Sequence, residues 1–318
     1  MGVANPAVVD ASADRARGCL LGLCVGGALG VAAAAGGRTR WELKGPTQAI
    51  GAPAAFALAL AESWEARAQL DPADLALRWD QLLAQGVEPG TTTAAALIGV
   101  AAGAPVERAA AVAARLQPGR AGDGTMARAL PLVLAAGGDR VLLRRLAYRS
   151  AAVTHADPVA AFAAVAVCLL GQDLGRRPLA EACRRTVQAL REDLPDRALD
   201  ALRPAPPGEA GGAGDDAVGV LAAVVAALAA PDLEDVVRVA AGHLAPASCG
   251  ALAGGLAGLR QGATAIPPRW LAALDPGLRE RCHRLAAALT QPPAPLEAVP
   301  APGPLAGPAA PPDGGRAT

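Results

Sequence analysis

Alanine and leucine dominate this chain, and its 318 residues include only two Phe and one Tyr. Alanine and leucine are strong helix formers, whereas strands favour β-branched and aromatic residues. The composition therefore favours a bundle of helices over a sheet. A core built mainly from small side chains also allows helices to approach one another closely.

Apolar residues recur with helical spacing along most of the chain, and Gly or Pro lies in nearly every gap between the apolar segments. The expected helices cover residues 12–35, 54–70, a segment that starts at Asp71-Pro72, 91–103, 105–116, 124–136, 139–152, 158–171, 178–192, 216–229, 232–242, 248–261 and 278–289.

This pattern predicts a single all-α domain over residues 12–290, folded as a compact multi-helix bundle. Residues 1–11 are expected to form a flexible N-terminus, and 203–214 a flexible loop inside the domain. Residues 291–318 are rich in Pro, Ala and Gly and lack apolar periodicity, so we expect a disordered tail.

The charges and cysteines exclude several classes of protein. The 29 basic and 29 acidic residues give a formal net charge of zero, and binding to nucleic acid requires a clustered basic surface. We therefore expect no nucleic-acid partner. None of the six cysteines has CxxC spacing, so we predict reduced, buried thiols in a cytoplasmic protein.

The run from Cys19 to Gly37 carries no charge and follows Arg15 and Arg17, which is the pattern of a secretory signal peptide. Within the run, Gly22, Gly26, Gly27 and Gly30 suit a helix that packs closely against another. We therefore predict a buried first helix rather than a signal peptide. No other uncharged apolar run reaches the length of a membrane span, and we expect no membrane partner.

Six segments resemble, in order, motifs of the ADP-ribosylglycohydrolase family. They are RARGCLLGLCVGGALG at 15–30, ALALAES at 57–63, GTTT at 90–93, GDGTMARALPL at 122–132, THADP at 154–158, and ALAGGLAGLRQG at 251–262 followed by AIPPRWL at 265–271. The resemblance implies a compact all-helical fold with a centre of two magnesium or manganese ions. Members of the family remove ADP-ribose from arginine, serine or other acceptors.

The acids on which that chemistry depends are missing. The family's TDDT motif corresponds to 51–54 and its GDTDT motif to 244–248, and no acidic residue occurs from 45 to 61 or from 236 to 274. Because magnesium and manganese prefer carboxylate oxygens, we expect no metal site and no cofactor. The family's acids would fall at Ala52, Pro53, Ala245 and Ala247, its catalytic glutamate at about Ala34, and the Asp of its opening helix at Gly27.

The resemblance implies that the remaining motif residues border a ligand cleft. The candidates are Thr92, Gly122, Asp123, Gly124, Thr125, His155, Asp157 and Ser248. The turn at Asp123 suits an anion at a helix start, or is a glycine turn with Asp123 as the N-cap. His155 is either an acid–base group of the pocket or a loop histidine bonded to backbone before the helix that starts at Asp157.

Two functions follow. The first is a catalytically inactive pseudo-hydrolase that binds an ADP-ribose-like or other small-molecule ligand, or a partner protein. The second is a repurposed, metal-independent enzyme that uses the same cleft, or a weak ADP-ribosyl hydrolase. Convergence of the polar candidates in one pocket would favour an enzyme, and scattered positions would favour a binding module.

Overall fold

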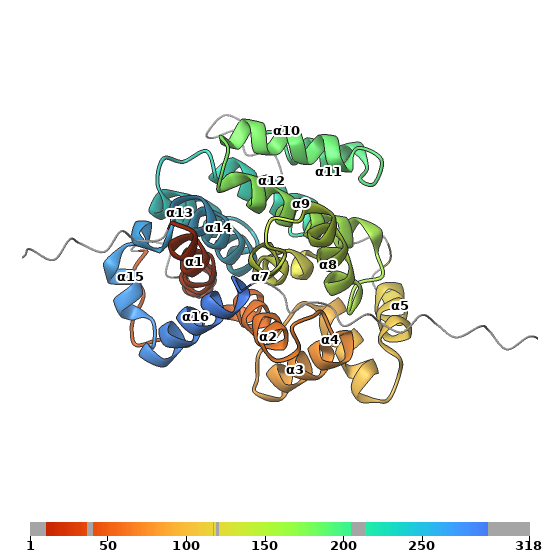
Figure 1. Ribbon diagram of the computed structural model, residues 1–318. Coiled ribbons are helices and arrows are strands. Elements are labelled where there is room, and N and C mark those ends of the chain that lie inside the picture. The colour runs from red at the N-terminus through yellow and green to blue at the C-terminus, as the bar shows by residue number, and fades with distance from the viewer. Residues whose placement is uncertain (1–10, 37–40, 117, 119–120, 205–213, 292–318) are drawn as a thin grey trace, which may run out of the picture.

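The computed structural model describes residues 11–36, 41–116, 118, 121–204 and 214–291 (Figure 1). Within these ranges the chain forms α-helices, two 3-10 turns and no strand, which confirms the all-α prediction. The elements are α1 (Ala11–Ala34), α2 (Gly51–Arg67), α3 (Pro72–Ala84), α4 (Thr91–Ala101), α5 (Val106–Leu116), η1 (Asp123–Thr125), α6 (Met126–Ala129), α7 (Pro131–Ala135), α8 (Arg140–Ala152), α9 (Pro158–Leu174), α10 (Leu179–Leu190), α11 (Asp196–Asp200), α12 (Ala217–Ala227), α13 (Leu233–Ala241), α14 (Pro246–Gln261), η2 (Ala263–Ala265), α15 (Pro268–Ala273) and α16 (Pro276–Leu289).

The first helix and α14 run antiparallel at backbone contact. Gly22 lies against Gly254, and a Cβ atom added to Gly22 would lie 2.2 Å from the Gly254 carbonyl oxygen. The same contact repeats four residues earlier, between Gly18 and Gly258, and four residues later, at Gly26. Only glycine allows two helix backbones to come this close. The close helix approach expected from the glycines of the first helix is therefore confirmed.

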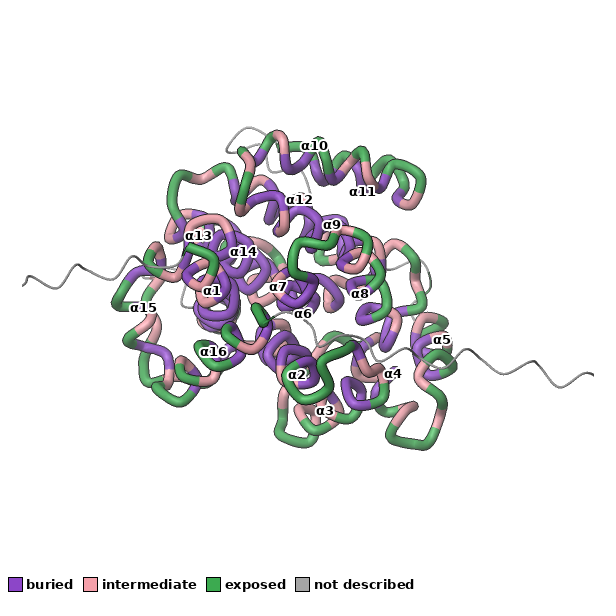
Figure 2. Tube along the Cα trace, in the orientation of Figure 1, coloured by how far each residue is buried: buried purple, intermediate pink, exposed green. Residues whose placement is uncertain are grey.

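Helices α1, α9 and α14 are buried along most of their length, whereas α10 and α11 turn one face to solvent (Figure 2). Helices α3 to α5 form one side of the molecule and α10 to α12 another (Figure 1). By length and hydropathy α1 could cross a membrane, but 83% of its apolar stretch is buried inside the fold. This burial is what we expect of a core helix.

The six cysteines are all free and buried, as the sequence predicts. Burial raises the pKa of the Cys183 thiol to about 11, and burial together with the charge of Asp123 raises that of Cys249 to about 12. These thiols therefore stay protonated near neutral pH and behave as small apolar groups.

Several helix boundaries differ from those expected. The segment 124–136 is not one helix but η1, α6 and α7, because Pro131 lacks an N–H group and starts a new helix. Helix α2 begins three residues earlier than expected, at Gly51, and the short helices α11 and α15 were not expected. The predictions for 1–10, 205–213 and 292–318 lie outside the described residues.

Acidic N-caps fix the starts of many helices. Asp157 accepts hydrogen bonds from two backbone N–H groups of α9, and Asp216 accepts one from α12. Asp157 was expected at the start of α9.

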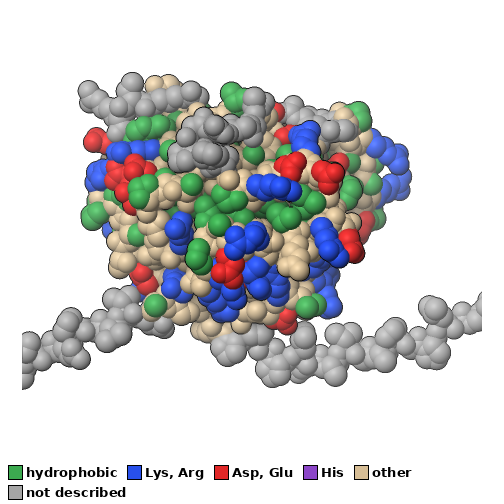
Figure 3. Space-filling view, turned by 90° about the horizontal axis from the view of Figure 1, so that it is seen from above, with side chains coloured by type: hydrophobic (Ala, Val, Ile, Leu, Met, Phe, Trp, Pro, Cys, Tyr) green, Lys and Arg blue, Asp and Glu red, His purple; other side chains and the backbone are tan. Residues whose placement is uncertain are grey.

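On the face above α10 to α12, acidic and basic side chains are mixed, and the basic ones gather in the lower half of the view (Figure 3).

Candidate functional site

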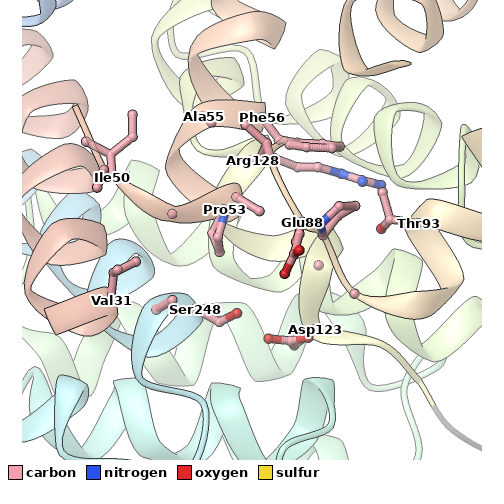
Figure 4. A pocket seen from close by; sticks show the side chains of 18 of the residues that line it. Val31, Ile50, Pro53, Ala55, Phe56, Glu88, Thr93, Asp123, Arg128 and Ser248 are labelled. Carbon is pink, nitrogen blue, oxygen red and sulfur yellow. The ribbon is translucent and has the colours of Figure 1, made fainter. Parts of the chain in front are cut away.

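A cavity of about 520 Å³ opens where the N-termini of α2 and α14 meet η1 and the loop between α3 and α4 (Figure 4). A volume of this size lies within the usual range for small-molecule sites. Its lining residues are Val31, Gln48, Ala49, Ile50, Gly51, Ala52, Pro53, Ala55, Phe56, Gly86, Val87, Glu88, Pro89, Gly90, Thr93, Asp123, Gly124, Arg128, Ala247 and Ser248.

Two segments almost 200 residues apart in the sequence meet in this cavity. Ala52 and Pro53 line it from the first turn of α2, and Ala247 and Ser248 line it from the first turn of α14. Three of the positions where the family carries acids therefore face one space. The other three positions, Gly27, Ala34 and Ala245, are not among the residues that line the cavity.

The C-terminal half of α1 holds these two helix starts in place. A Cβ atom on Gly27 would lie 2.1 Å from the carbonyl oxygen of Ile50, just before α2. A Cβ atom on Gly30 would lie 2.2 Å from the carbonyl oxygen of Pro246, the first residue of α14. The glycine that replaces the family's Asp at position 27 is thus part of this packing.

In the part of the chain that the structure describes, the carboxylates that line the cavity are those of Glu88 and Asp123. Their side chains and that of Ser248 extend toward the same space from three different walls (Figure 4). Among the described residues, no group of three or more His, Cys, Asp or Glu side chains is placed to hold a metal ion. The residues of the cavity therefore do not fit a centre of two divalent ions.

Arg128 forms part of the inner wall with a fully buried guanidinium group. Its guanidinium carbon lies 4.2 Å from the centroid of the Trp79 ring, and Nη2 donates a hydrogen bond of 2.6 Å to Thr154 Oγ1. Its Nε and Nη1 are buried without a hydrogen-bond partner. Burial lowers the pKa of Arg128 to about 9. A buried cation with unused donors is costly, so its place beside a ligand cavity suggests a role in recognition.

Thr93 rather than Thr92 faces the cavity. Thr93 is 2% exposed and lines the cavity beside the Arg128 guanidinium, whereas Thr92 is absent from the lining (Figure 4). Gly90 and not a threonine is the N-cap of α4. The register of this segment therefore differs by one residue from the one expected.

His155 lies behind the wall of the cavity. Its side chain is 3% exposed, and its Nδ1 lies 2.8 Å from Thr154 Oγ1. Burial, with a smaller contribution from the charge of Arg128, lowers the pKa of His155 to about 3, so the ring is neutral near pH 7. A Cβ atom on Gly122 would lie 2.6 Å from Nε2, so the ring packs directly against this glycine. The expectation of a side chain bonded to backbone was wrong, because the partner is a threonine hydroxyl.

The other candidates divide between cavity and scaffold. Asp123 and Gly124 line the cavity, and the N-cap prediction for Asp123 was wrong because Gly122 precedes η1 and no side chain caps it. Thr125 is buried and donates to the carbonyl oxygen of Ala160. Gly122, Thr125, His155 and Asp157 are not among the lining residues, so the polar candidates converge only in part.

Sequence reasoning missed two charged residues of the cavity, Glu88 and Arg128. Glu88 lies two residues before the GTTT segment, in a loop without a residue pattern of its own. Arg128 was visible as the only charged side chain between 126 and 138, and a lone charge in an apolar run is a signal for a buried functional group.

Comparisons with known proteins agree with the all-α fold. A family model described as ADP-ribosylglycohydrolase matches residues 9–296. A solved structure described as an ADP-ribosylglycohydrolase-related protein complex is similar with a TM-score of 0.70 and 28% sequence identity, covering 89% of this chain and 99% of that chain. No curated protein matches the chain.

Proposed function

Because the chain belongs to the ADP-ribosylglycohydrolase family, we propose that it is a catalytically inactive member that binds a small molecule in the cleft without metal ions. One observation carries this proposal. Ala52, Pro53 and Ala247 line the cavity where the family places carboxylates, while the cavity itself persists.

The chemistry of the family requires those carboxylates. Two divalent cations need several oxygen ligands, and they orient and activate an attacking water. Glu88 and Asp123 supply two carboxylates from a loop and a 3-10 turn, and the nearby helix starts add only the Ser248 hydroxyl. A water in this cleft therefore lacks the pair of metal ions on which the chemistry of the family relies.

The lining indicates the kind of ligand that fits. Ile50, Phe56 and Val87 provide apolar surface, and Thr93 and Ser248 provide hydroxyl groups. Carboxylates at the cavity wall repel a phosphate group when no metal ion lies between them. The part of the ligand near Glu88 and Asp123 is therefore a sugar hydroxyl or a cation, and an ADP-ribose-like ligand would place its phosphates elsewhere.

A metal-independent enzyme is the second candidate, because Glu88, Asp123 and Ser248 extend into one space (Figure 4). An acid–base mechanism needs a partner group with a pKa near the working pH. His155 packs behind Gly122, and burial lowers its pKa to about 3, so the ring is neutral near pH 7. This arrangement favours the binding module over the repurposed enzyme and over a weak hydrolase.

Titration calorimetry with manganese and magnesium ions, and separately with ADP-ribose, tests the proposal. We expect no stoichiometric metal site with a micromolar dissociation constant, and saturable binding of a nucleotide- or sugar-like ligand that is lost in Ser248→Trp, which fills the cavity. The matched control is the variant Ala52→Asp/Pro53→Asp/Ala245→Asp/Ala247→Asp, in which metal affinity should rise. Metal-dependent release of ADP-ribose from modified arginine or serine by the wild type would overturn the proposal.

A further inference from the structure

A second cavity, of about 430 Å³, lies at the opposite end of α1 from the candidate cleft. Ser12 and Arg15 line it from the first turns of α1, whereas Val31 lines the cleft near the other end of the same helix. At a rise of about 1.5 Å per residue, Arg15 and Val31 are roughly 24 Å apart along the helix. The two cavities are therefore separate sites.

Among the described residues that line this second cavity, the charged side chains are those of Arg15 and Arg176, and none is a carboxylate. Neither arginine forms an ion pair with a described residue, although most arginines nearby do. The acids next to them in sequence are engaged elsewhere: Asp14 accepts a hydrogen bond from Thr264, and Asp173 pairs with Arg140, Arg177 and Arg185.

An unused donor accompanies the two guanidinium groups. The side-chain nitrogen of Gln172, which also lines this cavity, is buried and has no hydrogen-bond partner. Buried polar groups are normally paired, so such a donor indicates a missing acceptor. The N-terminal end of α1 adds the positive end of a helix dipole to the same cavity.

Glycines keep both guanidinium groups open. A Cβ atom on Gly138 would lie 3.6 Å from Arg176 Nη2, and one on Gly175 would lie 3.8 Å from Arg15 Nη1. A larger side chain at either position would cover the neighbouring guanidinium group. The C-terminal ends of α7 and α9 lie nearby and attract cations. Neither arginine donates a hydrogen bond to the carbonyl groups of these two helices, so the N–H donors of both arginines stay available for a ligand.

We propose that the second cavity binds a small multivalent anion, either free phosphate or a phosphate group of a nucleotide, through Arg15, Arg176 and Gln172. Guanidinium groups recognise phosphate oxygens with paired hydrogen bonds, and the Gln172 amide supplies a further donor. The anion would join the start of α1 to the end of α9. This site does not depend on the proposed function of the cleft.

Calorimetric titration with inorganic phosphate, pyrophosphate and ATP, at constant ionic strength set with chloride, tests the proposal. We expect one saturable site per chain, and a loss of affinity of at least about tenfold in Arg15→Gln/Arg176→Gln, since two charge-assisted contacts are removed. Gln172→Leu should weaken binding less. Tighter binding of inorganic phosphate than of ATP identifies the free anion, and the reverse order identifies a nucleotide.

The matched control is Arg145→Gln/Arg184→Gln. Both arginines are exposed, lie outside the cavity and form no ion pair with a described residue, so their replacement should leave the affinity unchanged. Ser248→Trp blocks only the cleft, so binding that persists in this variant belongs to the second cavity. Equal losses in the two arginine pairs, loss of all binding in Ser248→Trp, or no saturable binding of any of the three anions would overturn the proposal.

Discussion

Replacement of Gly22 by alanine would force α1 and α14 apart at the centre of the core. The added Cβ atom would lie 2.2 Å from the carbonyl oxygen of Gly254, whereas C···O contacts between helices are normally about 3.3–3.6 Å long. The helices would have to separate by about 1 Å, because the clash is with backbone and no rotamer relieves it.

The cost follows from two opposing effects. A gap of this size removes roughly a quarter to a half of the dispersion attraction between the facing atoms, and overpacking a core costs about 1–3 kcal/mol or more. Alanine is favoured over glycine inside a helix by about 1 kcal/mol. We expect the clash to exceed the propensity gain and Gly22→Ala to lower the free energy of unfolding by about 2–3 kcal/mol. At roughly 2–4 °C per kcal/mol, the melting temperature would fall by about 5–10 °C.

Urea unfolding followed by tryptophan fluorescence, with thermal unfolding followed by circular dichroism, measures this loss. Gly99→Ala in α4 is the matched control, because its Cβ atom would meet only Ala109, with the methyl group at 3.1 Å and the Cα atom at 3.6 Å. This variant should change stability by less than about 1 kcal/mol. In Gly22→Ala/Gly254→Ala the losses should be less than additive, since the first substitution already separates the helices. A Gly22→Ala variant as stable as Gly99→Ala would refute the reasoning.

Three further predictions concern groups outside the cavity. The pKa of His155 is lowered to about 3 in the folded protein, whereas it lies near 6.5 in the unfolded chain. The unfolded chain therefore takes up the proton first, and the free energy of unfolding decreases as the pH falls below about 6.5, by at most about 1.4 kcal/mol per pH unit. In urea unfolding, His155→Gln should lose less stability than the wild type between pH 7 and pH 5. Asp157→Ala should cost about 1 kcal/mol through loss of the α9 cap, and Asp139→Ala, which removes the same two bonds from α8, should cost a similar amount in the same assay. Cys24 and Cys282 are buried with their sulfur atoms 3.6 Å apart, and their hydrogen bond and burial raise the pKa of Cys24, so a thiol reagent at pH 8 should label neither residue before unfolding.

Helix formation and the packing of α1 were predictable because both depend on local composition. Alanine-rich segments with Gly or Pro between them fix where helices form, and glycines at four-residue spacing indicate one face of close contact. The partner of that face was not predictable from spacing alone. The break at Pro131 follows from a single missing N–H group, which an apolar helical pattern conceals.

The position of a site residue was predictable where a sequence motif fixes its register. It was not predictable where the packing of distant segments decides which side chains enter the cavity. The positions of Pro53 and Ala247 follow from the motifs beside them, and the structure places both in one cavity. The side-chain direction of Thr93 rather than Thr92 depends on where α4 begins, which is set by Gly90. Glu88 enters the cavity from a loop, and the sequence of a loop does not fix where its side chains point.

The frame of the cleft does not depend on the acids that the chain lacks. The starts of α2 and α14 are held against α1 by backbone contacts at Gly27 and Gly30, and these contacts involve no carboxylate. Alanine and proline at positions 52, 53 and 247 add no buried charge that would require a partner. The packing of the fold therefore does not require acids at these positions, because the contacts that give the cleft its shape are made by the core. A family resemblance carried by glycines and apolar residues therefore indicates the fold and the position of the cleft, while the side chains that line the cleft determine what it binds.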